Sequence, residues 1–316
     1  MSQASPVVEV VDLVKRYRKA KVNAVDGVSL KVEAGEFFAL LGPNGAGKTT
    51  TISILTTTLA PTSGQVRICG FDLGREAASV RRKVGIIFQN PSLDMNLSGE
   101  ENVRLHAILY GLYPYRPALR LMPAAYRAQV AELAAVLGME RDMYQPVKKL
   151  SGGMQRKLEI IRGLMHRPSV LFLDEPTRGL DVASRRSLWT YLREVREQFQ
   201  VTIVLTTHYL EEAEQADRLC ILNHGRVVVM GTPGQVKARP EEEYLELEAA
   251  DRSQLRRELR DLKVEFEEDG AFTVRLDGRS VNEVVRSLEV PLTRLRTRQP
   301  TLEEAYLRIL AEEPNE

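Results

Sequence analysis

The chain has 316 residues, which is long enough for one large domain and a smaller one, each with its own core. Its 44 Lys and Arg residues nearly balance its 43 Asp and Glu residues, and a net charge of +1 offers no electrostatic reason to expect nucleic acid as the main partner. No segment approaches the run of about 18 apolar residues that a membrane-spanning helix needs, so we expect that the chain does not span a bilayer.

The N-terminus and the cysteines bear on the cellular compartment. Residues 1–6 have neither a basic start nor an apolar core, so we expect no secretory signal. Cys69 and Cys220 lie far apart and outside any paired-ligand spacing, which predicts reduced residues in or near the core. Reduced cysteines fit the cytosol. These features predict a soluble intracellular protein.

The first predicted elements lead into a glycine-rich segment. Residues 7–13 and 25–32 alternate apolar and polar side chains, which predicts two strands. An apolar run at 37–41 precedes the segment Gly42-Pro43-Asn44-Gly45-Ala46-Gly47-Lys48-Thr49, and the residues after it have the pattern of a helix start. Strand, glycine-rich turn and helix are the context in which a G-x-x-x-x-G-K-[ST] sequence forms a phosphate-binding loop.

The chemistry of this loop suits the phosphates of a nucleoside triphosphate. Its glycines let backbone N–H groups curl around an anion, and the following helix adds its positive N-terminal end. The Lys48 ammonium would neutralise charge on the β- and γ-phosphates, and the Thr49 hydroxyl would bind Mg²⁺. The alternative is an ordinary glycine turn. We predict that the chain binds a nucleoside triphosphate.

Further strands are predicted at 65–70 and 84–89, and from residue 100 to residue 164 the apolar spacing becomes helical. Continuous apolar runs then return at 170–173 and 202–205. Because helical segments flank these runs, they predict buried parallel strands.

Two carboxylates, Asp174 and Glu175, follow the apolar run at 170–173. A buried strand delivers them to the strand end, where an α/β fold places its ligand. Asp174 suits Mg²⁺ because hard cations take oxygen ligands. Glu175 is then free to polarise an attacking water as general base. The alternative is a solvated turn after a strand.

A second candidate anion site is Ser151-Gly152-Gly153, which follows Leu150 and opens an amphipathic stretch at 156–166. A serine and two glycines at a helix N-terminus leave backbone N–H groups free for an anion. Such residues also occur in linkers. Because these residues lie shortly before the strand that ends at Asp174, the motif favours an anion site over a linker.

The composition changes after residues 231–233, and residues 237–243 have the composition of a solvated connector. Beyond it the pattern predicts elements in the order βαββαβ, which is typical of a split βαβ, or ferredoxin-like, unit. The predicted strands are 244–248, 264–267, 272–276 and 293–298, and the predicted helices are 253–261 and 281–288.

A last helix, predicted at 302–310, closes this unit. Ser280 with Glu283, and Thr301 with Glu304, have the spacing of a capping box. The spacing supports helix starts at 281 and 302.

With these motifs in place, residues 7–235 resemble the ATP-binding-cassette (ABC) ATPases. The resemblance implies an α/β P-loop NTPase cassette over residues 1–236, with a β-rich N-terminal subdomain, a RecA-like core and an α-helical subdomain at about 93–165. The ferredoxin-like α+β domain at 241–316 follows it. The resemblance also implies ATP and Mg²⁺ as cofactors and ATP hydrolysis as the activity.

The resemblance implies that each ATP lies between two identical chains. Residues 150–154 look like the family signature, which contacts the γ-phosphate held by a partner subunit. Two chains would then face head to tail, with ATP between Lys48 of one and Ser151 and Gly153 of the other. The nucleotide-binding residues would be Tyr17, Gly42, Pro43, Asn44, Gly45, Ala46, Gly47, Lys48, Thr49, Thr50, Gln89, Ser151, Gly152, Gly153 and Asp181.

The resemblance also assigns catalytic and metal-binding roles. His208 looks like the histidine that stabilises the γ-phosphate, and Gln89 looks like the glutamine that reaches both Mg²⁺ and the membrane partner. The catalytic residues would be Glu175, His208 and Lys48, and the metal ligands Thr49, Gln89 and Asp174.

Two other residues have implied roles, and one departs from the pattern. Tyr17 looks like the aromatic residue that stacks on adenine, and Asp181 belongs to the loop that couples the two sites. The alternatives are that Tyr17 is a plain surface aromatic, His208 a structural histidine and Gln89 a turn residue. Arg178 stands where many relatives have a smaller or amide-bearing residue, so we expect it to perturb contacts across the dimer and to leave the catalytic residues intact.

Three classes of protein use such a cassette. Those that act on ribosomes usually carry two cassettes, whereas this chain has one phosphate loop and one signature. Chromosome and DNA-repair ATPases separate the two motifs by a very long coiled coil, whereas only about a hundred residues lie between them here. We therefore predict the motor of a transporter, held at the cytoplasmic face of the cell membrane by separate permease subunits.

The surface for the permease is expected on residues 93–145. Within it, residues 110–117 are rich in tyrosine and proline, which are common at contact surfaces. The alternative for this segment is an exposed loop with no partner.

The C-terminal tail favours export. Pro300, Leu302, Glu303 and Tyr306 match the Pro-x-Leu-Glu-x-x-Phe/Tyr segment that ends the daunorubicin-resistance and A-subfamily-like exporter ATPases. The alternatives are an importer ATPase and a non-transport soluble ABC ATPase. The cargo stays open, because substrate contacts belong to the permease.

The domain at 241–316 is expected to have a regulatory or dimerisation role. Arg294, Arg296 and Arg298 alternate along one predicted strand and would line one of its faces, either to contact a partner or simply as a solvated surface.

Overall fold

The computed structural model describes residues 6–237, 244–276 and 278–312. The start of the chain at 1–5 and most of the predicted connector, at 238–243, lie outside the described residues. The chain divides into two compact units, residues 1–229 and 230–316. This division falls a few residues before the predicted end of the cassette at 236, because helix α8 (Pro233–Lys237) packs against the last helix, α11 (Leu302–Glu312).

A six-stranded sheet in the order β10-β9-β3-β8-β7-β6 forms the centre of the first unit. Neighbouring strands from β9 to β6 run parallel. β3, β7 and β8 are buried along their whole length, as their continuous apolar sequences predict. The strands are β3 (Phe37–Leu41), β6 (Val84–Ile87), β7 (Val170–Asp174), β8 (Thr202–Thr207), β9 (Arg218–Asn223) and β10 (Arg226–Gly231). The predicted buried parallel strands at 170–173 and 202–205 are confirmed.

A second, antiparallel sheet in the order β2-β1-β4-β5 shares a core with the central sheet. Alternation along β1 turns Val8 and Val10 inward, and a bulge between Val10 and Leu13 turns Leu13 to the same side. These residues pack in one cluster with Phe38 and Phe172 of the central sheet. The strands are β1 (Val8–Lys15), β2 (Val25–Val32), β4 (Ser63–Ile68) and β5 (Phe71–Asp72), and the predicted strands at 7–13, 25–32 and 65–70 are confirmed with small shifts at the ends.

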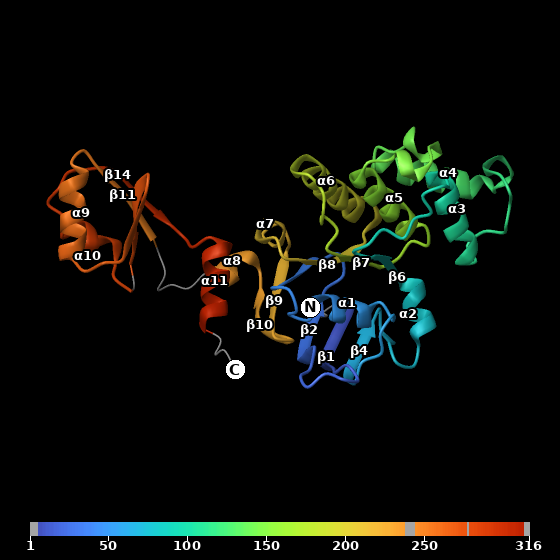
Figure 1. Cartoon of the computed structure of the whole chain (residues 1–316), viewed down its shortest axis with the longest axis horizontal. Coiled ribbons are helices and arrows are strands. Elements are labelled where there is room, and N and C mark those ends of the chain that lie inside the picture. The colour runs from blue at the N-terminus through green and yellow to red at the C-terminus, as the bar shows by residue number, and fades with distance from the viewer. Residues whose placement is uncertain (1–5, 238–243, 277, 313–316) are drawn as a thin grey trace, which may run out of the picture. The chain divides into compact units, whose positions relative to one another are not determined.

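Helices gather on the other side of the central sheet, as Figure 1 shows for α3, α4, α5 and α6. These four helices are α3 (Gly99–Leu109), α4 (Ala124–Val136), α5 (Gly152–Leu164) and α6 (Val182–Phe199). The first unit also contains three shorter α-helices, which are α1 (Lys48–Leu55), α2 (Ala77–Lys83) and α7 (Leu210–Ala213). The predicted helical region at 100–164 is confirmed as three α-helices, with short 3-10 helices between them at Leu119–Leu121, Asp142–Tyr144 and Val147–Lys149. The structure adds a capping box of Ser98 and Glu101 at the start of α3.

Several elements of this unit were missed in the sequence. β9 has the same kind of buried apolar run as β7 and β8, so the sequence does contain the pattern of a buried parallel strand there. α6 buries Leu188, Trp189, Leu192 and Val195 at helical spacing, and the Trp189 ring stacks on Phe37 at 4.9 Å between centroids. α6 thereby covers β3. The two predicted near-core cysteines are confirmed as free thiols, with Cys69 partly buried and Cys220 buried.

The second unit contains the predicted βαββαβ order. Its sheet is antiparallel in the order β12-β13-β11-β14 and is built around a core that includes Leu245, Leu255 and Phe272. The elements are β11 (Tyr244–Ala249), α9 (Arg252–Asp261), β12 (Phe266–Asp269), β13 (Ala271–Arg275), α10 (Val281–Arg286) and β14 (Leu292–Arg298). β12 begins two residues later than predicted, because Phe266 is the residue that pairs with Val274. Its ferredoxin-like classification stays a prediction.

The predicted last helix is present as α11. α11 starts with the predicted capping box, in which Glu304 N donates to Thr301 Oγ1 at 3.2 Å and Thr301 N donates to Glu304 Oε2 at 2.7 Å. The predicted capping box of Ser280 and Glu283 is also present. α11 packs chiefly against α8, and it belongs to the same compact unit as the βαββαβ sheet although its described residues are not part of the apolar core of that sheet.

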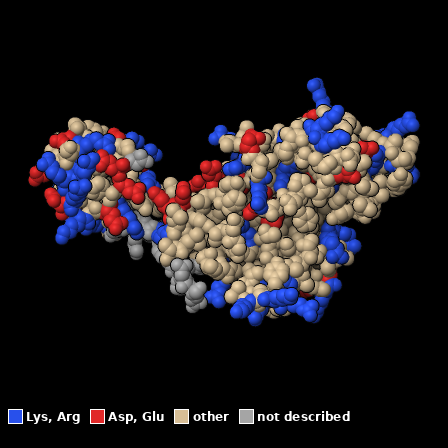
Figure 2. Space-filling model, in the orientation of Figure 1, with Lys and Arg blue, Asp and Glu red and all other residues tan. Residues whose placement is uncertain are grey.

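Charged side chains on β14 are paired within the unit. Arg294 and Arg296 lie opposite Glu248 and Glu246 on β11, and Arg298 Nε lies 3.6 Å from Glu246 Oε1. Figure 2 shows both signs of charge interspersed over the visible face of this unit. The predicted arginine face is therefore part of a mixed-charge surface.

The pair between Arg298 and Glu304 makes stability depend on pH. Hydrogen bonds from Arg298, at 2.8 and 2.7 Å, are the main cause that lowers the pKa of Glu304 from 4.5 to about 2. Because the folded protein has the lower pKa, the ionised carboxylate stabilises the fold fully above pH 4.5, and the contribution is lost as the pH falls towards 2.

Glu304→Gln is expected to lower the free energy of unfolding by about 1 kcal/mol at neutral pH, since solvent screens a partly exposed pair. Urea unfolding would measure the difference, which should shrink below pH 4.5. The matched control is Glu303→Gln, because Glu303 is an exposed neighbour on the same helix. A difference for Glu304→Gln that stays constant down to low pH would contradict this account.

Candidate functional site

Four parallel strands end at one cavity of about 540 Å³. β3 leads into the glycine-rich loop, β6 into Gln89, β7 into Glu175 and β8 into His208. Because the strands are parallel, their carboxyl ends share one edge of the sheet, where α/β folds place ligands. The cavity is lined by Ala24, Asn44, Gly45, Ala46, Gly47, Lys48, Thr49, Thr50, Gln89, Glu175, Arg178, His208 and Tyr209. Most predicted site residues from the loop and from the ends of β6, β7 and β8 are thus brought together, whereas Gly42, Pro43 and Asp174 lie beside the cavity without lining it.

The loop after β3 has the geometry of an anion site. Gly47 caps α1 with φ of 100°, and a Cβ at this position would lie 2.5 Å from the carbonyl oxygen of Ala24, so only glycine fits. α1 starts at Lys48 without a side-chain cap. Its first N–H groups and its positive end therefore face the cavity.

Lys48 brings a buried positive charge to the loop. Its Nζ donates to the carbonyl oxygens of Gly42 and Pro43, at 2.7 and 3.0 Å. Burial lowers the pKa of Lys48, while the charges of Glu175 and Asp174 act in the opposite direction. The ammonium group thus lies where the loop, β3 and the acidic end of β7 meet.

Asp174 lies at the end of β7 and is held by two hydroxyl groups. Its Oδ1 accepts hydrogen bonds from Thr206 Oγ1 at 2.6 Å and from Thr49 Oγ1 at 3.2 Å. Burial raises the pKa of Asp174, and the two hydroxyl bonds oppose that shift. The contact joins the phosphate loop to β7, so two of the predicted metal ligands, Thr49 and Asp174, lie within hydrogen-bond distance of each other.

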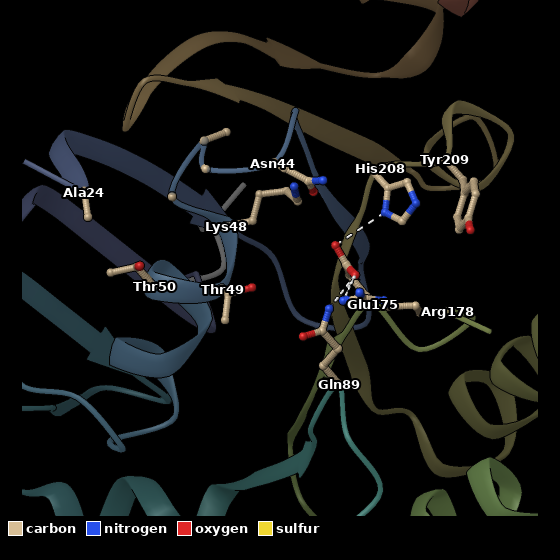
Figure 3. A pocket seen from close by; sticks show the side chains of 13 residues that line it. Ala24, Asn44, Lys48, Thr49, Thr50, Gln89, Glu175, Arg178, His208 and Tyr209 are labelled. Carbon is tan, nitrogen blue, oxygen red and sulfur yellow. Dashed lines mark hydrogen bonds and ion pairs between the residues drawn. The ribbon is translucent and has the colours of Figure 1, made fainter. Parts of the chain in front are cut away.

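Glu175 lies at the centre of a cluster of donors, which point towards it in Figure 3. Gln89 Nε2 donates to its Oε2 at 2.6 Å, Arg178 lies 3.5 Å from the same oxygen, and His208 Nδ1 lies 3.3 Å from its Oε1. The backbone of Glu175 is left-handed, with φ of 45°, and its N–H donates to Thr206 Oγ1 at 3.0 Å. Such backbone strain occurs where a side chain must be aimed at a site.

Comparisons with known proteins agree with this geometry. The family model described as ABC transporter matches residues 25–178. The chain is 40% identical over 238 residues to the daunorubicin/doxorubicin resistance ATP-binding protein of Streptomyces peucetius, which covers 75% of this chain and 68% of that protein. It is 34% identical to the daunorubicin resistance ATP-binding protein of Streptomyces coeruleorubidus, over 95% of this chain and 94% of that one.

The chain belongs to the ABC transporter family. Among solved structures, it is similar to cbiO1 from Clostridium perfringens, with a TM-score of 0.66, 27% identity and coverage of 75% of this chain and 92% of that chain. It is also similar to an ATP-binding cassette captured in a post-hydrolysis state with ADP and Pi, with a TM-score of 0.61, 29% identity and coverage of 71% and 98%. The predicted family, the P-loop cassette fold and the ATP-binding ATPase activity are confirmed.

In this ABC ATPase, a buried ion pair anchors Gln89 to the helix that carries the signature. Arg156 of α5 donates to the carbonyl oxygens of Phe88 at 2.6 Å and Gln89 at 2.9 Å, and it pairs with Glu159 at 2.8 Å. Glu159 in turn accepts from the backbone N–H of Ser92 at 3.0 Å. A rigid connection therefore runs from the start of α5 to the backbone beside Glu175.

The remaining predicted residues of the cassette do not line the cavity of their own chain. Ser151 and Gly152 are exposed at the start of α5, with Ser151 capping the helix, and Asp181 caps α6. A Cβ on Gly153 would lie 3.2 Å from Ser184 Oγ, so the signature packs close to the first turn of α6. The Tyr17 hydroxyl lies 3.3 Å from Thr50 Oγ1, beside the start of α1.

Three lining residues had no role in the sequence-based prediction. Tyr209 follows His208 directly, so its adjacency was a usable signal. Ala24 precedes β2 and reaches the loop only through folding, so no local pattern marks it. Arg178 was noted only as a departure from the family pattern, yet it lies at the cavity and faces Glu175.

Proposed function

We propose that this chain is the motor subunit of an ABC exporter, that ATP binds in the cavity at the carboxyl edge of the central sheet, and that two chains close on it. The observation that carries this proposal is the convergence of the loop, Lys48, Asp174, Glu175 and His208 at one edge. These groups match the requirements of phosphoryl transfer, which depends mainly on positioning and charge neutralisation.

The positive groups of the cavity are the proposed binding site for the phosphates. The loop N–H groups and the end of α1 would hold the β- and γ-phosphates, and Lys48 would exchange its carbonyl partners for phosphate oxygens. His208 adds a donor on the opposite side of the cavity. Donors fixed before the reaction stabilise the charge that develops on the γ-phosphate.

The donor set at the end of β7 fits Mg²⁺. Thr49, Asp174 and Gln89 offer hydroxyl, carboxylate and amide oxygens, the ligand types that this hard cation takes. We assign these three residues as its ligands, supported by the 3.2 Å contact of Thr49 with Asp174. When bound, the ion supplies charge neutralisation at the β- and γ-phosphates.

Glu175 is the proposed general base. Its carboxylate would take the proton of the attacking water, while Gln89 and His208 hold the carboxylate in place. Proton transfer requires an oriented base, and the donors around Glu175 leave the carboxylate few alternative positions.

The exposed signature supports a composite site between two copies. Ser151, Gly153 and Asp181 lie outside the cavity of their own chain, so we propose that they act on the nucleotide of a second chain. The cassette with ADP and Pi, which is similar to this chain, is described as dimeric. Tyr17 is proposed to stack on the adenine ring.

The membrane partner is proposed to be a separate permease. Among the residues that the structure describes, no helix has the length and apolarity to cross a membrane. Relatives named for drug resistance, and the Nod factor export ATP-binding protein of Paraburkholderia xenovorans (36% identical), favour export. We therefore place the chain at the cytoplasmic face of the cell membrane, bound to permease subunits.

The C-terminal unit, residues 241–316, is proposed to stabilise the dimer or to regulate it. Support comes from its own apolar core and from the mixed-charge surface on β11 and β14, which offers ion pairs to a partner.

Glu175→Gln is expected to bind ATP and to accumulate as an ATP-bound dimer while steady-state hydrolysis falls by at least about 100-fold, because an amide cannot accept the proton of the attacking water. Phosphate release and size-exclusion chromatography with ATP would measure both effects. Glu197→Gln is the control, because Glu197 is an exposed carboxylate on α6 outside the cavity lining, and it should keep the activity. Normal hydrolysis by Glu175→Gln would refute the role assigned to Glu175.

A permease with six membrane-spanning helices is expected to be encoded beside this chain and to co-purify with it. The complex, reconstituted in vesicles with the ATP site outside, should move cargo into the lumen in an ATP-dependent manner, which corresponds to export. Transport in the opposite direction would identify an importer, and the absence of a co-purifying permease would favour a non-transport ATPase.

Removal of residues 241–316 is expected to weaken the ATP-dependent dimer and to change its rate of hydrolysis. Sedimentation and ATPase assays would measure both. Because truncation also uncovers α8, the double variant Arg294→Gln/Arg296→Gln tests the charged surface with the core left intact. Unchanged dimer formation and hydrolysis in both variants would rule out the proposed role.

A further inference from the structure

A buried carboxylate beside the nucleotide cavity, Glu212, links two segments that carry catalytic groups. It lies on the short helix α7 and is 1% exposed. Its Oε1 accepts a hydrogen bond from Thr177 Oγ1, and its Oε2 accepts one from Thr207 Oγ1 at 2.6 Å. Neither the sequence motifs nor the cavity lining includes Glu212.

The two donors lie next to the proposed catalytic residues. Thr177 follows Glu175 by two positions, and Thr207 directly precedes His208. Both threonines are 1% exposed. Thr207 Oγ1 also accepts from the backbone N–H of Tyr209 at 2.9 Å. Glu212 therefore joins Thr177, in the segment after β7, to Thr207, the last residue of β8. Through Thr207 Oγ1 it also holds the N–H of Tyr209, so the residues directly before and after His208 are both fixed.

A cation and an aromatic ring complete the cluster. Arg185 of α6 places its Nε 4.0 Å from Glu212 Oε1, and its guanidinium lies 4.1 Å from the centre of the Tyr209 ring. The Tyr209 and His208 rings are 4.0 Å apart between centroids. α6 starts at the Asp181 cap, so the cluster also reaches the segment proposed to contact the second chain.

The arrangement determines where each hydroxyl points. Because both Glu212 oxygens accept, the Thr177 and Thr207 hydroxyls must donate to them, and the lone pairs of Thr207 are left for the N–H of Tyr209. The Glu212 carboxylate and the two threonine hydroxyls are satisfied in this way, whereas Arg185 Nε, 4.0 Å from the carboxylate, makes no hydrogen bond to any residue that the structure describes. Buried polar groups that are satisfied by one another hold one geometry. The geometry fixed in this way is the approach of His208 to Glu175, 3.3 Å between Nδ1 and Oε1.

We propose that Glu212 is a positioning residue for ATP hydrolysis, which holds His208 against Glu175 and the γ-phosphate by joining the ends of β7 and β8. This inference rests on the role proposed above for His208. Glu212 does not line the cavity, and it acts through Thr207 and Thr177.

Glu212→Ala is expected to lower kcat by about 10- to 100-fold, because loss of the link allows a displacement of His208 on the scale of 1 Å. The KM for ATP should change little, since the loop that holds the phosphates is not part of the cluster. Glu212→Gln, which keeps one acceptor oxygen, should fall between wild type and Glu212→Ala. Glu211→Gln is the matched control, because Glu211 is exposed on the same helix.

The deciding experiment is a double-mutant cycle with His208→Ala in single-turnover hydrolysis. If Glu212 acts through His208, Glu212→Ala should have little further effect in the His208→Ala background. An equal loss in both backgrounds, or a loss that vanishes after correction for the folded fraction, would overturn the proposal.

Two further measurements separate this inference from the assignments on which it rests. If His208→Ala alone hydrolyses ATP normally, the role of His208 fails, and the positioning role of Glu212 fails with it. If Glu212→Ala does not fold, Thr207→Val removes the same link at nearly constant volume and should reproduce the loss of kcat. Wild-type kcat in Thr207→Val would also overturn the proposal.

Discussion

The parallel direction of β3, β6, β7 and β8 is the constraint on which the rest of this structure depends. Parallel strands end at the same edge, so residues that are far apart in the chain meet there without any long-range motif of their own. Burial of β3, β7 and β8 between layers fixes the depth at which each strand ends. The phosphate loop, the acidic pair and His208 lie close together because the strands that precede them end at that shared edge.

Loops at this edge are held by buried polar pairs as well as by apolar packing. Arg156 with Glu159 anchors the backbone around Gln89, and Glu212 joins the segments after β7 and β8. Removal of one partner from such a pair leaves an uncompensated buried group, so these pairs specify one arrangement. Glu175 has a left-handed backbone, its N–H donates to Thr206, and three side chains, those of Gln89, Arg178 and His208, orient its carboxylate. The edge is thus preorganised by contacts within a single chain.

Most of the fold could be predicted, because strands and helices are encoded by local periodicity. The buried runs of β7 and β8 and the capping box at Thr301 are local signals, and they were read correctly. β9 has the same kind of signal and was missed, whereas the packing of α11 on α8 depends on surfaces far apart in the sequence. Among the lining residues, Ala24 and Arg178 had no local pattern that assigned them to the site.

The sequence by itself determined the chemistry of the site: a loop whose glycines and lysine suit phosphates, a strand that ends in two carboxylates, and a second glycine motif at a helix start. These properties follow from residue type and short spacing. Only the tertiary structure decided that Gln89 and His208 meet at Glu175 and that Glu212 binds Thr177. Those contacts join residues 86, 33 and 35 positions apart, and their geometry comes from strand order and packing, which no local pattern encodes.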